Sequence, residues 1–125
     1  MARHNDIGKW GEDLARDTLI AKGYGIVESN WRSGKLELDI IATKGNRIVF
    51  VEVKTRTSAA VDPLLAIDSR RINHLIRAAQ SYIASHDIKH DYQFDIITII
   101  GSPESSESPV IEHVADAFLP PLRTY

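Results

Sequence analysis

The strongest constraint on the fold of this chain is a β-hairpin signal near its middle. Two apolar segments, residues 36–42 and 48–56, flank a Lys-Gly-Asn sequence at residues 44–46 that has the composition of a tight turn. Both segments are typical of buried strands, yet Asp39 lies inside the first and Glu52 inside the second. Charged side chains in such strands require a specific partner or a function.

Side-chain alternation predicts where these charges lie. In the first strand the even-numbered residues from 36 to 42 are expected to share one face, with Asp39 on the other. If the apolar faces of both strands meet one core, Glu52 and Lys54 emerge on the same side as Asp39. A turn at residues 44–47 then sets Asp39 opposite Glu52, with Cβ atoms roughly 4.5 to 5.5 Å apart. Two carboxylates this close repel each other unless a cation lies between them, which is the arrangement of a divalent-cation site.

An ordinary structural explanation competes with the metal site. The solvent-facing side of an antiparallel sheet often carries acids and bases, and opposite charges across strands stabilise it. Against this, Ile48 and Phe50 place apolar side chains on the charged face as well. Apolar residues on both faces favour a sheet that is covered on both sides, but the pattern alone leaves both explanations open.

At these residues the chain resembles a known group of proteins. Asp39 followed by Glu52-Val53-Lys54 is similar to the active-site signature of the restriction-endonuclease-like nuclease superfamily, and the wider pattern resembles the uncharacterised YraN-like bacterial family. The resemblance covers most of the chain and includes Gly8-Lys9-Trp10-Gly11-Glu12, Lys22-Gly23-Tyr24, Asn30 with Arg32, Ala66-Ile67, Ala78-Ala79 and Phe94-Asp95-Ile96. Two positions depart from it: Leu38 stands where the superfamily often has Pro, and Arg71 where YraN-like proteins commonly have Lys. Neither departure removes a metal ligand.

The resemblance implies both a fold and a site. The fold is expected to be an α/β restriction-endonuclease-like sandwich, with a central mixed β-sheet flanked by helices. Asp39, Glu52 and Lys54 match the catalytic residues, and Asp39, Glu52 and the Val53 carbonyl match the ligands of Mg²⁺ or Mn²⁺. Glu12 occupies the place of a first-helix metal ligand in archaeal Holliday-junction resolvases, which are similar in layout. By pattern alone, its position at the border of an apolar helix face favours a structural acid.

A second predicted helix carries a candidate surface for phosphates. Its apolar stripe repeats at helical spacing and consists of Ile72, Leu75, Ile76, Ala79 and Ile83. Another face carries Arg70, His74 and Arg77, and Arg71 flanks it. A basic row opposite a core stripe is usually a solvated helix face. Beside the hairpin carboxylates, and together with Arg56, it also suits nucleic-acid binding.

The remaining pattern predicts one domain over residues 1–125. The expected elements are a first helix from Asp6 to Lys22 capped by Asn5 or Asp6 and ended by Gly23, an edge strand at 24–31, a strand at 93–100 and a short strand at 110–114. Residues 57–63 are expected to form a loop at the rim of the site and residues 116–125 a C-terminal tail. Asp95 is expected to be a buried acid bonded to backbone or Arg.

Composition narrows the class of protein. The chain has no Cys, which excludes disulfides and thiolate metal sites, and it has neither a signal peptide nor a membrane-spanning stretch, so we expect a cytoplasmic protein without a membrane partner. Its net charge of −2 argues against indiscriminate coating of nucleic acid, so phosphate binding must be local.

These observations predict an Mg²⁺- or Mn²⁺-dependent nuclease, expected to act as an endonuclease on DNA in repair, recombination or uptake. The pattern leaves open RNA as the substrate and an exonuclease as the activity. Two alternatives are a nucleic-acid-binding accessory protein with a weak or inactive nuclease site, and a scaffold domain with a solvated charged sheet. Because junction resolvases cut two strands as dimers, a homodimer is a further expectation by analogy.

Overall fold

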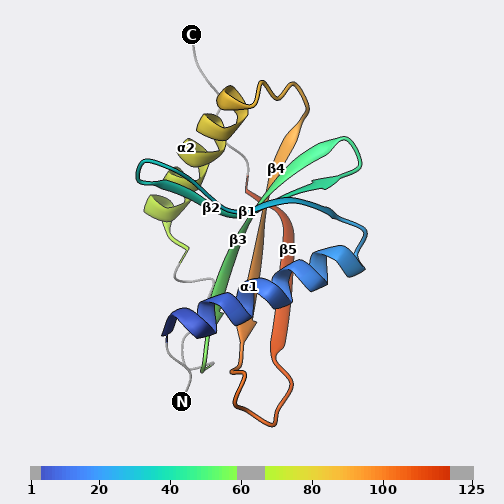
Figure 1. Ribbon diagram of the computed structural model, residues 1–125, viewed down its shortest axis with the longest axis vertical. Helices are drawn as coiled ribbons and strands as arrows, with labels where there is room; N and C mark the ends of the chain where they lie inside the picture. Colours follow the sequence, from blue (N-terminus) through green and yellow to red (C-terminus); the bar gives the residue numbers. More distant parts are fainter. Residues whose placement is uncertain (1–3, 59–66, 119–125) are drawn as a thin grey trace.

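In the computed structural model, which describes residues 4–58 and 67–118, two helices flank a five-stranded mixed β-sheet (Figure 1). The elements are α1 (His4–Ala21), β1 (Gly25–Ser33), β2 (Leu36–Lys44), β3 (Arg47–Arg56), α2 (Ser69–Ser85), β4 (Tyr92–Ile100) and β5 (Val110–Phe118). The strand order is β1-β2-β3-β4-β5, in which β3 and β4 are parallel and the other neighbours antiparallel. This confirms the α/β fold expected from the sequence, a mixed sheet between helices as in a restriction-endonuclease-like sandwich.

Each face of the sheet is covered by one helix over an apolar core. Beneath α1 the core includes Ala15, Leu19, Ile40, Ala42, Val49, Val51, Ile97 and Ile99. Beneath α2 it includes Leu38, Ile41, Phe50, Leu75, Ala79, Tyr82 and Phe94. Because both faces are buried, the central strands are apolar along nearly their whole length. The expectation of a covered sheet is therefore confirmed.

The parallel pairing of β3 with β4 places the charged strand in the middle of the sheet. A parallel neighbour requires a long crossover, and the segment from Arg56 to Tyr92, which contains α2, supplies it. The crossover lays α2 over the face of β3 that carries Phe50 and Glu52. The side of β3 that a solvated sheet would expose to water is thus closed by a helix.

The hairpin of β2 and β3 has the predicted register. Lys44 pairs with Arg47 and Ile40 with Val51, so the same register places Asp39 opposite Glu52. The two residues between Lys44 and Arg47 form the turn, with Gly45 at a φ of 58° that favours glycine.

The predicted alternation along β2 is wrong at one point. Ile40 packs beneath α1 as expected, whereas Leu38 packs on the opposite face, beneath α2. The change of face falls at Asp39. On the neighbouring strand, the residue opposite Asp39 in the register is Asn30, whose φ is 55°. A left-handed residue interrupts the regular strand geometry, and Asn tolerates that conformation better than most residues.

The ends of several elements differ from the sequence prediction. Helix α1 begins at His4, so Asn5 and Asp6 lie inside it instead of capping it, while Gly23, at a φ of 89°, follows its last turn as predicted. Strand β5 continues to Phe118, whose ring stacks on that of Phe94 at 4.7 Å between centroids. The first residues of the expected tail therefore belong to the sheet. Residues 119–125 and residues 59–66, which include most of the expected rim loop, lie outside the described residues.

Within residues 4–58 and 67–118, no helix has both the length and the apolar character needed to cross a membrane.

Candidate functional site

Two carboxylates, the half-buried Asp39 and the buried Glu52, meet where β2 and β3 run side by side. Asp39 hydrogen-bonds to Glu52, and the Val53 backbone N–H donates to Asp39 Oδ2 at 2.9 Å. The side chain of Glu52 is only 3% exposed. The two acids that the sequence predicted to face each other across the hairpin are thus in direct contact.

The structure adds a partner that the sequence interpretation did not assign to this pair. Arg71 in α2 donates from Nη2 to Glu52 Oε1 at 2.8 Å and from Nε to Glu52 Oε2. Asp68 caps α2 and accepts the Arg71 backbone N–H at 3.0 Å, which fixes the first turn of the helix beside the pair. A bidentate Arg–carboxylate pair of this kind is among the stronger interactions available to a buried acid.

A positional signal for this contact is present in the sequence. Arg71 precedes Leu75 by four residues and Ala78 by seven, and both of these are buried. In a helix, positions i, i+4 and i+7 share one face. Arg71 therefore belongs to the side of α2 that faces the sheet, beside the basic row that it was predicted to flank.

The two acids have opposite pKa shifts. Burial, with the hydrogen bond and negative charge of Glu52, raises the pKa of Asp39 from 3.8 to about 8. Burial alone would also raise the pKa of Glu52, but hydrogen bonds from Arg71 and Asp39 and the positive charges of Arg71 and Lys54 lower it. These opposite directions favour a proton on Asp39 and the negative charge on Glu52.

Glu12 approaches the pair from the other face of the sheet. Helix α1 packs closely against β3 because Gly11 has no side chain, whereas any side chain at this position would collide with Thr55. This close packing brings Glu12 near the pair. Burial raises the pKa of Glu12, while a hydrogen bond with Asn30 and the charge of Arg16 act in the opposite direction. Its charge also contributes to the raised pKa of Asp39.

Glu12 does not join the pair as a third ligand in this conformation. Among the described residues, no group of three or more His, Asp or Glu side chains is arranged to hold a metal ion. The reason is the placement of the acids: Glu12 extends from α1, whereas Glu52 projects towards α2. Asp39, at the point where β2 changes face, interacts electrostatically with both.

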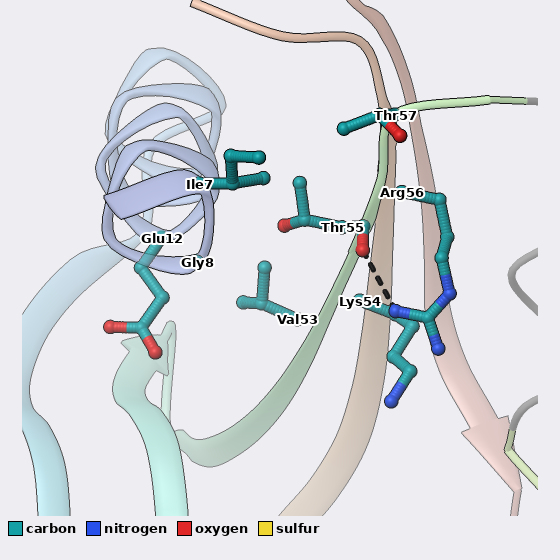
Figure 2. Close-up of a pocket in the computed structure, with 8 residues that line it drawn as sticks. All are labelled: Ile7, Gly8, Glu12, Val53, Lys54, Thr55, Arg56 and Thr57. Carbon is teal, nitrogen blue, oxygen red and sulfur yellow. Dashed lines mark hydrogen bonds between the residues drawn. The ribbon is translucent and has the colours of Figure 1, made fainter. Parts of the chain in front are cut away.

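A pocket of about 460 Å³ lies between α1 and the second half of β3 (Figure 2). It is lined by Ile7, Gly8, Glu12, Val53, Lys54, Thr55, Arg56 and Thr57. Val53 and Thr55 point towards α1, and the side chains of Lys54 and Arg56 lie on the opposite side of the strand (Figure 2). Arg56 Nη1 donates to the Thr55 carbonyl at 2.8 Å. The pocket lining thus includes one carboxylate, that of Glu12, and two cationic residues that follow Glu52 along β3, Lys54 and Arg56.

The predicted phosphate-binding residues are divided by the structure. Arg70 and Arg77 are exposed on α2, and Arg56 is half-buried at the pocket. Arg71 is directed at Glu52. His74 is half-buried, and its Nε2 is covered without a hydrogen-bond partner in the described part of the chain. Only Arg70 and Arg77 form the exposed basic row expected on this helix.

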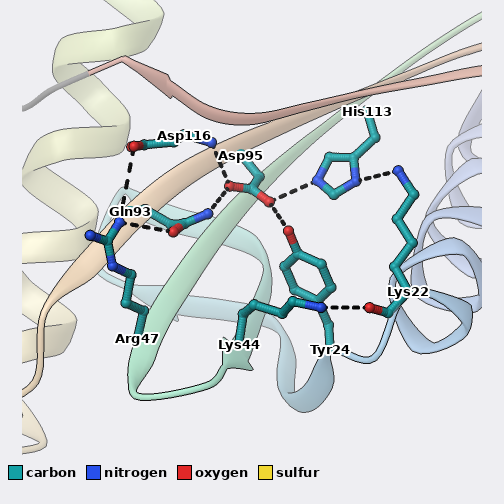
Figure 3. A network of polar contacts seen from close by, with 8 residues as sticks. All are labelled: Lys22, Tyr24, Lys44, Arg47, Gln93, Asp95, His113 and Asp116. Carbon is teal, nitrogen blue, oxygen red and sulfur yellow. Dashed lines mark hydrogen bonds and ion pairs between the residues drawn. The ribbon is translucent and has the colours of Figure 1, made fainter.

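A second buried polar cluster surrounds Asp95 (Figure 3). This carboxylate accepts hydrogen bonds from Tyr24 Oη at 2.9 Å, Gln93 Nε2 at 2.8 Å, His113 Nε2 at 2.7 Å and the Asp116 backbone N–H at 3.0 Å. Lys22 donates to His113 Nδ1 at 2.9 Å, so the proton of His113 is on Nε2, where it reaches Asp95. Asp95 is thus the buried structural acid that was expected, with Tyr, Gln, His and backbone donors in place of Arg.

The fold and the paired acids define an α/β protein with a largely enclosed carboxylate pair at the centre of a mixed sheet. The chain belongs to the uncharacterised protein family UPF0102, whose sequence model matches residues 11–99. This confirms the YraN-like resemblance. The matched segment contains the charged residues of the site, namely Glu12, Asp39, Glu52, Lys54, Arg56 and Arg71.

Relatives cover nearly the whole chain. A UPF0102 protein of Bacteroides thetaiotaomicron is 44% identical over 98% of this chain and 99% of its own length. One of Flavobacterium psychrophilum is 44% identical over 94% of this chain and 98% of its own length, and one of Phocaeicola vulgatus is 40% identical over 98% and 99%. The names of these relatives state no activity.

The raised pKa of Asp39 predicts how stability depends on pH. The folded protein holds the Asp39 proton more tightly than the unfolded chain, so this group contributes stability that is fully present below pH 3.8 and is lost as the pH rises to about 8. The Asn side chain of Asp39→Asn does not titrate, so the variant does not lose this stability as the pH rises. In chelator, urea denaturation should therefore show the variant gaining on the wild type as the pH rises through this range. Asp17→Asn, a change of an exposed acid on α1, should follow the wild type. A variant that instead falls behind the wild type as the pH rises would mean that Asp39 is stabilised as an anion.

The Asp95 cluster predicts a cost for removing one donor. Burial and the bond to Asp95 raise the pKa of Tyr24 to about 12, so Tyr24 donates its proton throughout the physiological range. Tyr24→Phe should lower the free energy of unfolding by about 1–3 kcal/mol. Tyr92→Phe, in which the ring packs on Phe50 and Phe94, should change it by less than about 0.5 kcal/mol. Equal effects in urea denaturation would rule out a special role for the Tyr24 hydroxyl.

Proposed function

We propose that this protein is a metal-dependent nuclease of the restriction-endonuclease-like superfamily, which hydrolyses DNA phosphodiester bonds with Mg²⁺ or Mn²⁺. The observation that carries the proposal is the contact between Asp39 and Glu52 on adjacent central strands. Lys54 lies two residues beyond Glu52 along β3. Two carboxylates in contact at a buried position are unfavourable unless a proton or a cation separates them. The α/β sandwich architecture is consistent with the same superfamily.

The donor chemistry fits a hard divalent cation. Mg²⁺ is commonly held by one or two carboxylates and retains several water molecules, so a third acidic ligand is not required. Asp39 and Glu52 would supply the two carboxylates and the Val53 carbonyl a neutral oxygen. The raised pKa of Asp39 beside Glu52 indicates that positive charge is favourable between the two carboxylates. When bound, the cation would polarise the phosphoryl oxygen and lower the pKa of a water molecule.

The cationic side chains beside the pair have distinct roles in this proposal. The Lys54 ammonium projects on the same side of β3 as Glu52 and affects its pKa, so it is close enough to stabilise negative charge that develops near the pair. Arg56 lies at the pocket, where its planar guanidinium suits a phosphate of the bound strand. Arg70 and Arg77 would add phosphate contacts that orient the nucleic acid without reading its sequence.

A second candidate function is favoured by one observation. Arg71 already neutralises Glu52 through both carboxylate oxygens, so the site is stable without a metal ion. This arrangement suits an accessory protein that binds nucleic acid and has a weak or inactive nuclease site. The two candidates differ in a measurable way, because both bind nucleic acid but only the first cleaves it.

Purified protein should cleave DNA in the presence of Mg²⁺ or Mn²⁺ and not in chelator. Glu52→Gln should reduce cleavage by about 10²-fold or more, since it removes the ionised ligand, and Lys54→Ala should have a similar effect because it removes the ammonium. Glu112→Gln, a change of an exposed acid on β5, is the matched control and should retain activity. Binding without cleavage of linear or branched substrates in either metal would favour the accessory protein.

The exposed basic row predicts a change in the salt dependence of binding. Each phosphate contact that is lost should reduce the slope of log K against log salt by about one unit. Arg70→Glu combined with Arg77→Glu should therefore weaken binding and reduce this slope. Lys35→Glu combined with Lys89→Glu changes the net charge equally at other exposed positions and serves as the control. If both double variants have the wild-type slope, Arg70 and Arg77 belong to a solvated helix face.

A further inference from the structure

The Arg71–Glu52 ion pair lies at the atoms that a metal ion would need. Glu52 uses both carboxylate oxygens to accept hydrogen bonds from Arg71. The exposed fraction is 3% for the Glu52 side chain and 29% for that of Arg71, so the pair is closed on the sheet side and open on the Arg71 side. The guanidinium is thus a cation bound at Glu52 from the solvent edge.

A guanidinium and a divalent cation compete for the same carboxylate. A dication placed at Glu52 would be repelled by the charge of Arg71, and it would approach carboxylate oxygens that both already accept a hydrogen bond from Arg71. Removal of Arg71 without a replacement is also unfavourable, because it leaves a buried anion without its partner. Exchange of one cation for another avoids both costs.

The attachment of Arg71 to α2 permits such an exchange. Its backbone N–H is held by the Asp68 cap, so the main chain stays in place when the side chain changes rotamer. The neighbouring residue Arg70 is exposed, and the guanidinium of Arg71 is itself partly exposed. A rotation away from Glu52 would therefore bring a second arginine to the solvent side of α2, where a phosphate could accept its two parallel N–H donors.

We infer that Arg71 is an internal competitor for the divalent cation at Glu52, and that binding of the cation releases its guanidinium to contact a nucleic-acid phosphate. The inference rests on the proposed function, since it presupposes a metal site at Asp39 and Glu52. It adds a regulatory link between the two ligands: metal binding and phosphate binding each favour the state in which Arg71 has left Glu52. The site is then held closed in the absence of both ligands.

The first test measures metal affinity without any substrate. Mn²⁺ is titrated into the full chain by calorimetry for the wild type, Arg71→Gln, Arg71→Lys and Arg32→Gln. The last variant removes an exposed arginine whose Nε lies 3.4 Å from Glu37, so it is a matched loss of an Arg–Glu pair. We expect Arg71→Gln to bind Mn²⁺ about tenfold or more tightly than the wild type, Arg71→Lys to be intermediate because Lys cannot bind bidentately, and Arg32→Gln to be unchanged.

Arg71→Gln leaves Glu52 without its partner and is expected to have a lower melting temperature in chelator. Mn²⁺ should restore the melting temperature of this variant, and the increase should be larger than in the wild type. If Arg71→Gln does not fold in chelator, Arg71→Lys, which keeps a positive charge at Glu52, provides the comparison. Circular dichroism of each variant verifies that the comparison is made between folded proteins.

The second test measures the release of the guanidinium. Binding of a short DNA duplex is followed at several salt concentrations, in chelator and in Ca²⁺, which takes oxygen ligands as Mg²⁺ does. In the wild type the salt slope should increase by about one unit when Ca²⁺ is added, because Arg71 gains a phosphate contact. In Arg71→Gln the slope should not change on addition of Ca²⁺.

The possible results separate the inference from the proposed function. If the wild type and both Arg71 variants bind Mn²⁺ with equal affinity, or if the variants bind it more weakly, Arg71 does not compete and the inference is overturned, while the metal site stands. If neither the wild type nor any Arg71 variant binds Mn²⁺, the metal site itself is wrong and both fail. A salt slope that does not respond to Ca²⁺ in the wild type overturns the release of Arg71.

Discussion

Burial of negative charge in an apolar sheet is the constraint on which the central part of this structure depends. A carboxylate removed from water must be protonated, paired with a cation or surrounded by donors. The half-buried Asp39 and the buried Glu52 and Asp95 use three different solutions. Asp39 has a raised pKa that favours its protonated form, Glu52 accepts a bidentate bond from Arg71, and Asp95 accepts four hydrogen bonds. The first two solutions depend on positive charge that a metal ion could also supply, whereas the third is complete with protein groups alone.

The position of the carboxylate pair follows from how the helices reach the sheet. The crossover between β3 and β4 lays α2 over one face, and Arg71 in its first turn reaches Glu52. On the other face Gly11 allows α1 to pack against Thr55, which brings Glu12 near the pocket. Asp39 lies where β2 changes face and interacts with acids on both sides. The candidate site is therefore built by contacts between elements, and its charge state responds to the placement of both helices.

The ion pair of Arg71 with Glu52 connects the two candidate functions. In an accessory protein it would be a permanent substitute for the metal ion. In a nuclease it would be a closed state that a cation and a nucleic acid open together. The same contact has opposite consequences because an arginine beside a buried carboxylate can either complete a site or occupy it. Family membership alone does not distinguish these cases, since function depends on the chemistry of the site.

Local pattern in the sequence determined the hairpin, its register and the contact of Asp39 with Glu52, because the two-residue period of strands and a Lys-Gly-Asn turn are local properties. It also determined the order of helices and strands and the burial of Asp95. The tertiary structure alone decided the rest. Leu38 packs on the opposite face from Ile40, next to Asn30 of the neighbouring strand with its positive φ, and Phe118 belongs to the sheet, where it stacks on Phe94. Arg71, predicted only to flank the basic row, pairs with Glu52 because a buried anion outweighs the hydration of one guanidinium, and that competition exists only once α2 is packed on β3.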